Sequence, residues 1–172
     1  MARVSIDPFE HMAEIYALMK KPGLLLTCGT QGNPITIGWG GLTIAWGKPV
    51  FTALVRHSRY SYELLEANGD FAVNVPEPGN RDLAKAVAWC GVHSGRDGDK
   101  CDAQGLNREP GITIDVPYIA ECPLHLECRT VFTSDMDLKD LDSRIHAQHY
   151  PTDDAHKMYW GEILGAWKVK EQ

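Results

Sequence analysis

Residues 24–55 read LLLTCGTQGNPITIGWGGLTIAWGKPVFTALV, and this stretch decides the fold class. Four strand-like runs, 24–28, 34–39, 42–46 and 50–55, are separated by short glycine-containing turns, with no helical pattern between them. Strands joined by short connections pair antiparallel, because a parallel pair needs a crossover of a dozen or more residues. The stretch therefore predicts an antiparallel barrel or sandwich rather than a doubly wound α/β sheet.

The rest of the chain adds helices and further strands to this core. Apolar residues at helical spacing predict a helix that begins with Asp7 as its cap and Pro8 in its first turn. Pro123 indicates that the strand around it lies at an edge or carries a bulge. The other expected elements are helices over 62–69 (capped by Ser58), 81–89 and, as a short helix or loop, 140–149; a loop over 93–104; and strands over 71–75, 119–133 and 158–169.

Composition describes one ordinary globular domain over residues 1–172. The 17 Lys and Arg against 23 Asp and Glu give a net charge of −6, which argues against a nucleic-acid partner because phosphate backbones need a basic face. The sequence has neither a signal-peptide pattern nor a run of about 20 apolar residues, so we expect a cytoplasmic protein with no membrane partner. Its five cysteines form no CxxC pair and are expected as free thiols.

Two polar segments are candidates for holding a phosphate. Residues 56–61, Arg-His-Ser-Arg-Tyr-Ser, lie between a strand end and a helix start. Helix N-terminal amides favour an anion there, and arginine adds charge-assisted hydrogen bonds. In residues 93–100, Arg96 and Lys100 add charge for the same anion. The alternatives are a solvated basic turn in the first segment and an exposed charged loop in the second.

Five tryptophans and 16 glycines are also unevenly placed, since several fall between Gly38 and Gly47. A strand rich in glycine allows a flat ring to approach the backbone closely. The alternative is that Trp39 and Trp46 are core or interface aromatics, the commoner role of tryptophan.

Other constellations are weaker. His146, His149 and His156 with Asp153 and Asp154 suggest a metal site, but their spacing matches no metalloenzyme signature, so surface histidines are favoured and no metal is predicted. The sequence contains no GxGxxG, GxxxxGK[ST] or GxSxG motif. A nicotinamide cofactor, if used, is therefore not held by a Rossmann domain.

In this order, the motifs resemble the flavin reductase-like, FMN-binding split-barrel family, and within it the flavoredoxin-like branch. The resemblance implies a mainly β fold: a six-stranded antiparallel split barrel with a Greek key and capping helices. It also implies a homodimer with FMN near the interface. The motifs that carry it are residues 33–39, 46–49, 55–61, 71–76, 94–100 and 161–164.

Carried over residue by residue, the resemblance assigns a role to each matching position. The FMN phosphate and ribityl end falls to Arg56, Ser58, Arg59, Tyr60 and Ser61, completed by Ser94 and Lys100. The isoalloxazine ring falls to Thr43, Ile44, Ala45 and Trp46, with Trp39 beside it. Asn74 is expected to be structural. The chain departs from the family pattern at Gly98, at Cys101 and over residues 135–154, which affects the substrate side more than the phosphate side.

The resemblance implies an FMN-dependent oxidoreductase that moves hydride or electrons from NAD(P)H or a protein donor to a small-molecule or protein acceptor. The cofactor carries the chemistry and the protein supplies binding and orientation. Hydride transfer to a flavin needs no general acid or base, so no catalytic side chain is predicted. An FMN-binding carrier or sensor without turnover remains the alternative, and a metal-dependent hydrolase is the third.

Overall fold

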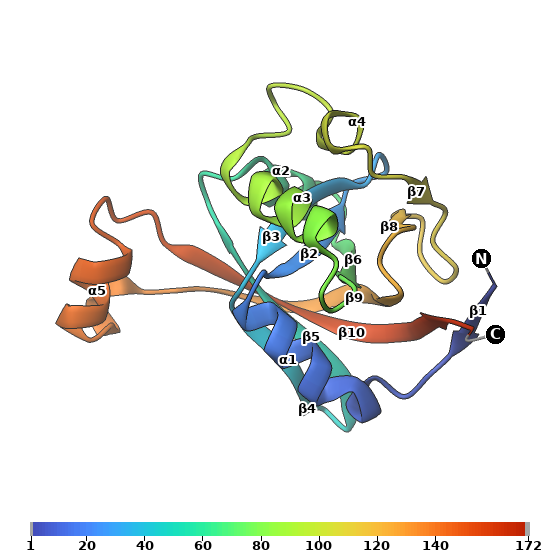
Figure 1. Cartoon of the computed structure of the whole chain (residues 1–172). Helices are drawn as coiled ribbons and strands as arrows, with labels where there is room; N and C mark the ends of the chain where they lie inside the picture. The colour runs from blue at the N-terminus through green and yellow to red at the C-terminus, as the bar shows by residue number, and fades with distance from the viewer. Residues whose placement is uncertain (1, 171–172) are drawn as a thin grey trace.

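A computed structural model describes residues 2–170 (Figure 1). The helices are α1 (Met12–Lys20), α2 (Tyr60–Ala67), α3 (Arg81–Val92), α4 (Lys100–Gln104) and α5 (Ser143–His149), with 3-10 turns η1 (Pro8–His11) and η2 (Leu138–Asp140). The strands are β1 (Arg3–Ser5), β2 (Leu24–Cys28), β3 (Asn33–Ile37), β4 (Gly40–Ala45), β5 (Lys48–Arg56), β6 (Asp70–Val75), β7 (Arg108–Glu109), β8 (Tyr118–Ile119), β9 (Leu124–Asp135) and β10 (His156–Val169).

The main sheet confirms the predicted mainly β, antiparallel class. Its order is β3-β2-β6-β9-β10-β5-β4, and every pair is antiparallel. With β1 added against the end of β10, the described part of the chain forms eight strands in this sheet rather than the six expected. β1 is only three residues long, and the Arg3 guanidinium helps to hold it by donating to the carbonyl groups of Ala120, Cys122 and Pro123. Such distant contacts leave no pattern in the local sequence.

The core lies between the curved halves of this sheet. All five residues of β2 are buried, whereas β5 alternates from Phe51 onward, with Phe51, Ala53 and Val55 buried and the residues between them partly exposed. Alternation of this kind marks a strand with one face on the core. Phe71 and Tyr159 are the large aromatic side chains that complete the core.

Three local predictions were wrong in detail. β9 is one long strand paired on both sides, with β6 and β10, and it begins after Pro123, so the proline removes no ladder hydrogen bond from it. The pairing of β9 with β10 is irregular at two places: Val131 is the extra residue in β9, opposite Trp160/Gly161, and Leu164 is the extra residue in β10, between Ile163 and Gly165. α2 begins at Tyr60, with Arg59 and not Ser58 at its N-cap. The loop over 93–104 contains the short helix α4, which Asp99 caps.

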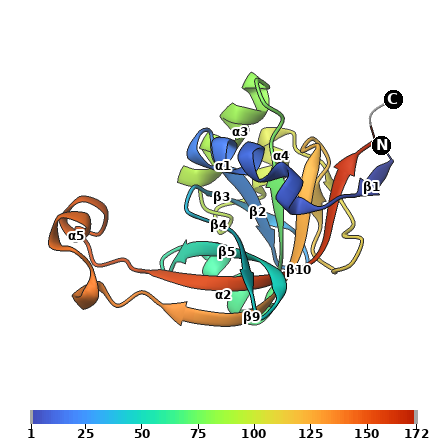
Figure 2. The same cartoon turned by 90° about the horizontal axis from the view of Figure 1, so that it is seen from below.

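The helices place the polar segments around one end of the β2–β3 hairpin. Each of α2, α3 and α4 contacts β3. Figure 2 shows α3 and α4 on one side of the molecule and α2 on the other, and it shows α5 at the tip of an arm that projects from the ends of β9 and β10. No helix within residues 2–170 is long and apolar enough to cross a membrane.

Candidate functional site

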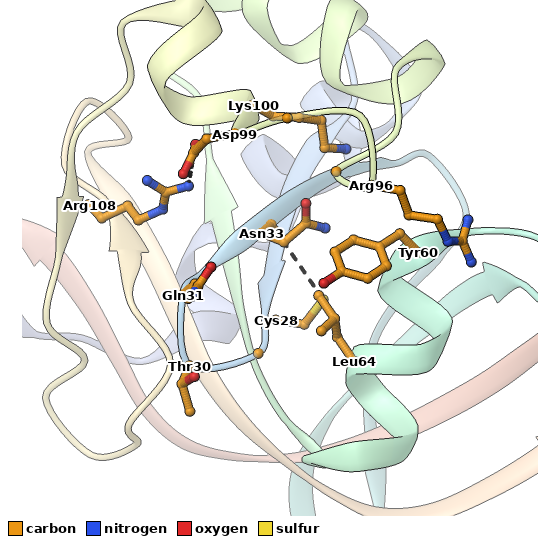
Figure 3. Close-up of a pocket in the computed structure, with 13 residues that line it drawn as sticks. Cys28, Thr30, Gln31, Asn33, Tyr60, Leu64, Arg96, Asp99, Lys100 and Arg108 are labelled. Carbon is orange, nitrogen blue, oxygen red and sulfur yellow. Dashed lines mark hydrogen bonds and ion pairs between the residues drawn. The ribbon is translucent and has the colours of Figure 1, made fainter.

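Three cavities follow the β2–β3 hairpin in order. The outer cavity, about 430 Å³, begins at the turn between the strands (Figure 3). The middle cavity, about 100 Å³, lies beside Asn33 and Ile35, and the inner cavity, about 190 Å³, lies beside Thr36–Trp39. Five residues line both the outer and the middle cavity: Asn33, Tyr60, Gly95, Arg96 and Lys100. The first two cavities are therefore neighbours with a shared wall.

Lys100 is the most unusual residue of this wall. Its side chain is only 3% exposed, and its ammonium group donates to the carbonyl oxygens of Cys90 (3.0 Å) and His93 (3.2 Å) at the end of α3. It forms no ion pair with any residue from 2 to 170. Burial lowers the pKa of this amine. A buried cation without a negative partner is costly, and an anion in the cavity relieves that cost.

The start of α2 supplies further anion donors to the middle cavity. No side chain caps the first amides of this helix. Arg59, at the N-cap, is exposed, and in the described structure its side chain makes no hydrogen bond or ion pair. Ser61 is buried, and its hydroxyl accepts from Asn33 Nδ2 at 2.9 Å. Uncapped amides, a free guanidinium and Lys100 converge on one small cavity, which suits a phosphate.

Arg96 and Ser94 complete the middle cavity from the following loop. The Arg96 guanidinium lies over the ring of Tyr60, 5.4 Å from its centroid, and pairs with Glu63. It also donates to the carbonyl oxygen of Ser58 at 3.3 Å. The charge of Arg96 is thus partly balanced by a carboxylate, unlike the charge of Lys100.

Two predicted phosphate residues are engaged elsewhere. Arg56 points into the base of the α5 arm, where it donates to the carbonyl oxygens of Asp154 (2.6 Å) and His149 (2.8 Å). The hydroxyl and amide of Ser58 both donate to the carboxylate of Asp154, at 2.6 and 3.2 Å. Arg56 lines the inner cavity and not the middle one, whereas Ser58 does line the middle cavity.

The inner cavity has an aromatic wall. Trp39 lines it, and its ring lies 5.3 Å from that of His149 and 5.1 Å from that of His156. His156 is buried and bonded through Nδ1 to the hydroxyl of Tyr150 at 2.8 Å. Burial, together with the charge of Arg56, lowers the pKa of His156 to about 4, so its ring is neutral at pH 7.

The remaining predicted ring contacts lie apart from the three cavities. Thr43, Ile44, Ala45 and Trp46 lie at the end of β4, the edge strand of the sheet, and line none of these cavities. Ile44 is 70% exposed and Trp46 64% exposed. Trp46 instead joins Phe132 and Trp160, with ring centroids 6.0–6.3 Å apart.

Sequence reasoning did not place Asn33, His156 or Arg108 in the site. Asn33 stood in a resembling motif, so that signal was present. Arg108 pairs with Asp99 at 2.6 Å and donates to the carbonyl oxygen of Gly32 at 3.2 Å. Gly32 is distant from Arg108 in the sequence, so no local pattern indicates this contact. The histidines of the arm do not gather on a metal: over residues 2–170 no three His, Cys, Asp or Glu side chains are placed to hold one. His146 pairs with Asp153 at 2.7 Å instead.

Comparison with known proteins decides the family. A model of the "Flavin reductase like domain" matches residues 16–172. The chain belongs to this family. An uncharacterized protein of Archaeoglobus fulgidus is 31% identical over 108 residues, which are 63% of this chain and 59% of that protein. The chain thus aligns with under two thirds of that relative's length.

Solved structures of the family confirm the split-barrel fold. Flavoredoxin from Methanosarcina acetivorans is 28% identical, with a TM-score of 0.68 over 87% of this chain and 69% of that one. An NADH:FAD oxidoreductase from Streptomyces globisporus C-1027 is 21% identical, with a TM-score of 0.64 over 86% and 75% of the two chains, and it shows the fold alone. Family membership supports a flavin-binding redox function.

Proposed function

We propose that this chain is an FMN-dependent oxidoreductase that binds the flavin through its phosphate in the middle cavity. Lys100 carries the proposal, because its buried ammonium group lines this cavity and, within the described part of the chain, bonds to carbonyl oxygens and to no carboxylate. Arg59 and the first amides of α2 face the same space from the other element. This donor set fits a phosphate monoester, which carries a charge of about −1.5 to −2 at pH 7.

The isoalloxazine ring then lies toward the inner cavity. Trp39 and His156 supply flat faces there, and Arg56 adds a positive charge at its edge. A positive charge near a reduced flavin ring stabilises the negative charge that the ring gains. When bound, the flavin supplies the hydride and electron chemistry, and the protein contributes orientation and charge. His156 is neutral at pH 7, so Arg56 is the cation of this wall.

A second copy of the chain completes the site in this proposal. Trp46 and Phe132 form an exposed aromatic patch with the partly exposed Trp160, next to the exposed Ile44 on the edge strand β4. Such patches mark interaction surfaces. In a homodimer, the residues 43–46 predicted to border the ring approach it from the partner's β4. Light scattering should give the mass of a dimer, and the double substitution Trp46→Ser with Phe132→Ser should give a monomer that still folds.

Membership of the flavin reductase-like family supports a redox role. The similar Streptomyces globisporus protein is named an NADH:FAD oxidoreductase, and this name supports a nicotinamide nucleotide as the donor. We propose NAD(P)H as the donor and a small molecule or protein as the acceptor.

The absorbance spectrum tests this function. The purified protein with FMN should show shifted flavin bands at one flavin per chain, and anaerobic NADH or NADPH should bleach them. Absence of flavin binding at millimolar FMN would refute the proposal. Binding without bleaching by either nucleotide would refute the NAD(P)H assignment and leave an FMN carrier or a protein-linked donor.

A further inference from the structure

The base of the α5 arm packs against the loop that leads from β5 into α2. Figure 2 shows the arm, and residues 149–155 form the segment that returns from it to β10. The Arg56 guanidinium donates to two carbonyl oxygens of this segment, those of His149 and Asp154. A guanidinium presents its donors in a rigid fork, so these two bonds fix the backbone of the segment and with it the position of the Asp154 carboxylate.

Asp154 in turn binds Ser58, which lies two residues before the start of α2. Its carboxylate accepts from the Ser58 hydroxyl at 2.6 Å and from the Ser58 amide at 3.2 Å. A serine beside a helix start otherwise caps the helix, because its hydroxyl oxygen accepts from an amide two or three residues later. For Ser58 these are the amides of Tyr60 and Ser61. No side chain caps α2, and within residues 2–170 no backbone group outside this helix accepts from either amide.

We propose that Asp154 is a positioning residue for the anion site of the middle cavity. By binding the hydroxyl and the amide of Ser58, it keeps the first amides of α2 uncapped and free to donate to a phosphate. This inference rests on the proposed function. Lys100, whose buried ammonium group lines the same cavity, is the independent observation that points to an anion there. Asp154 lines none of the three cavities, so it acts through Ser58, which lines the middle one.

The charge of Asp154 and its hydrogen bonds act on a phosphate in opposite directions. A carboxylate near the middle cavity repels an anion, because like charges repel. Its hydrogen bonds to Ser58 favour the anion, because they leave the amides of α2 free. Two substitutions separate these effects: asparagine removes the charge and keeps an oxygen that accepts from Ser58, whereas alanine removes both.

The test titrates FMN and riboflavin into the flavin-free wild type, Asp154→Asn and Asp154→Ala, and follows flavin fluorescence. Asp154→Asn should bind FMN at least as tightly as the wild type, and Asp154→Ala about tenfold more weakly than Asp154→Asn. Riboflavin, which lacks the phosphate, should bind all three proteins equally. Adding Ser58→Ala to Asp154→Ala should recover most of the lost FMN affinity, because no hydroxyl then remains to cap α2.

Asp153→Asn is the matched control, because it removes a neighbouring charge without touching Ser58. The Asp153 side chain is 77% exposed and pairs with His146 at 2.7 Å. Its backbone has a φ of 57°, a left-handed conformation that asparagine also adopts. This variant should leave the affinities for FMN and riboflavin unchanged.

Amide hydrogen exchange, followed by NMR on the flavin-free protein, gives a second measurement that needs no flavin. The amides of Tyr60 and Ser61 should exchange more slowly in Asp154→Ala than in the wild type, because the released Ser58 hydroxyl caps them. They should exchange as fast as in the wild type when Ser58→Ala is added.

Three results would overturn the positioning role of Asp154: equal FMN affinity of the alanine and asparagine variants, an equal loss of riboflavin binding in Asp154→Ala, or unchanged exchange of the two amides. Failure of the proposed function is a different result. In that case no flavin binds the wild type, while the exchange rates still change as described and support the control of the α2 amides by Asp154.

Discussion

Lys100→Met separates a phosphate-binding role from a structural one. The substitution removes the buried ammonium group and keeps an unbranched side chain of similar length. A hydrogen bond to a charged group contributes about 1.5–3 kcal/mol, and about 1.4 kcal/mol is tenfold in affinity. We therefore expect FMN to bind about 10- to 100-fold more weakly. Riboflavin, which lacks the phosphate, should bind the variant and the wild type equally.

The free energy of unfolding of the flavin-free protein should change little in Lys100→Met, because the substitution has two opposing effects. The carbonyl oxygens of Cys90 and His93 lose their donor at the end of α3, which destabilises the folded state. At the same time the variant no longer bears the free-energy cost of burying the charged ammonium group, which stabilises the folded state. Burial lowers the pKa of Lys100, so at neutral pH protonation of this amine favours the unfolded chain. We expect the free energy of unfolding to change by less than about 2 kcal/mol.

The assay is quenching of flavin fluorescence, with FMN and riboflavin titrated into both proteins. Lys85→Met is the matched control, because Lys85 lies on the exposed side of α3, where its ammonium group pairs with Asp82. It should leave both affinities unchanged. An equal loss of FMN and riboflavin binding in Lys100→Met, or no loss of either, would refute the placement of the phosphate beside Lys100.

Three further predictions follow from particular contacts. Arg59→Ala should weaken FMN binding about tenfold and leave the free energy of unfolding within about 0.5 kcal/mol, because this side chain makes no hydrogen bond or ion pair with any residue from 2 to 170. A large loss of stability in urea would contradict this. Burial alone would raise the pKa of Glu127, but hydrogen bonds from His125, Ile112 and Thr113 outweigh burial and hold that pKa at about 2. Glu127→Gln should therefore destabilise the fold by about 3 kcal/mol at pH 7. The difference in free energy of unfolding between the wild type and this variant, measured in urea, should be smaller by about 1.4 kcal/mol at pH 3.5 than at pH 7. The reason is that the ionised Glu127 stabilises the folded state, and this contribution is lost as the pH falls from 4.5 toward 2. A difference that stays constant with pH would contradict the lowered pKa of Glu127. Gly161→Ala should cost about 1–3 kcal/mol in thermal or urea unfolding, because a Cβ there meets Phe71 at 2.5 Å and Cys128 at 2.8 Å, and a neutral result would show that these side chains move aside freely.

The strands were predictable because their signal is local. Alternating or continuous apolar runs, bounded by glycine and proline, identified β2 to β6 within a few residues. The segment proposed for the phosphate was equally visible in the sequence, since Arg59, Tyr60 and Ser61 follow a strand and open a helix. Lys100, about forty residues later in the chain, lines the same cavity, and its role toward a phosphate stays a prediction.

The orientation of Arg56 and Ser58 was not predictable from the sequence. Both were assigned to the phosphate, but each is bonded to the segment 149–154 that returns from the α5 arm. That segment lies more than 90 residues away in the chain and departs from the family pattern. Which acceptor a side chain reaches depends on where such a segment packs, and local spacing carries no information about it.

The ³¹P NMR spectrum of bound FMN tests most directly whether its phosphate lies against Lys100 and Arg59. A free phosphate monoester loses its second proton near pH 6, so its chemical shift moves with pH in that range. In the site described here, the neighbouring cations hold the phosphate as a dianion. The signal of bound FMN should stay constant between pH 5.5 and 8, and a signal that titrates like that of free FMN would contradict the account.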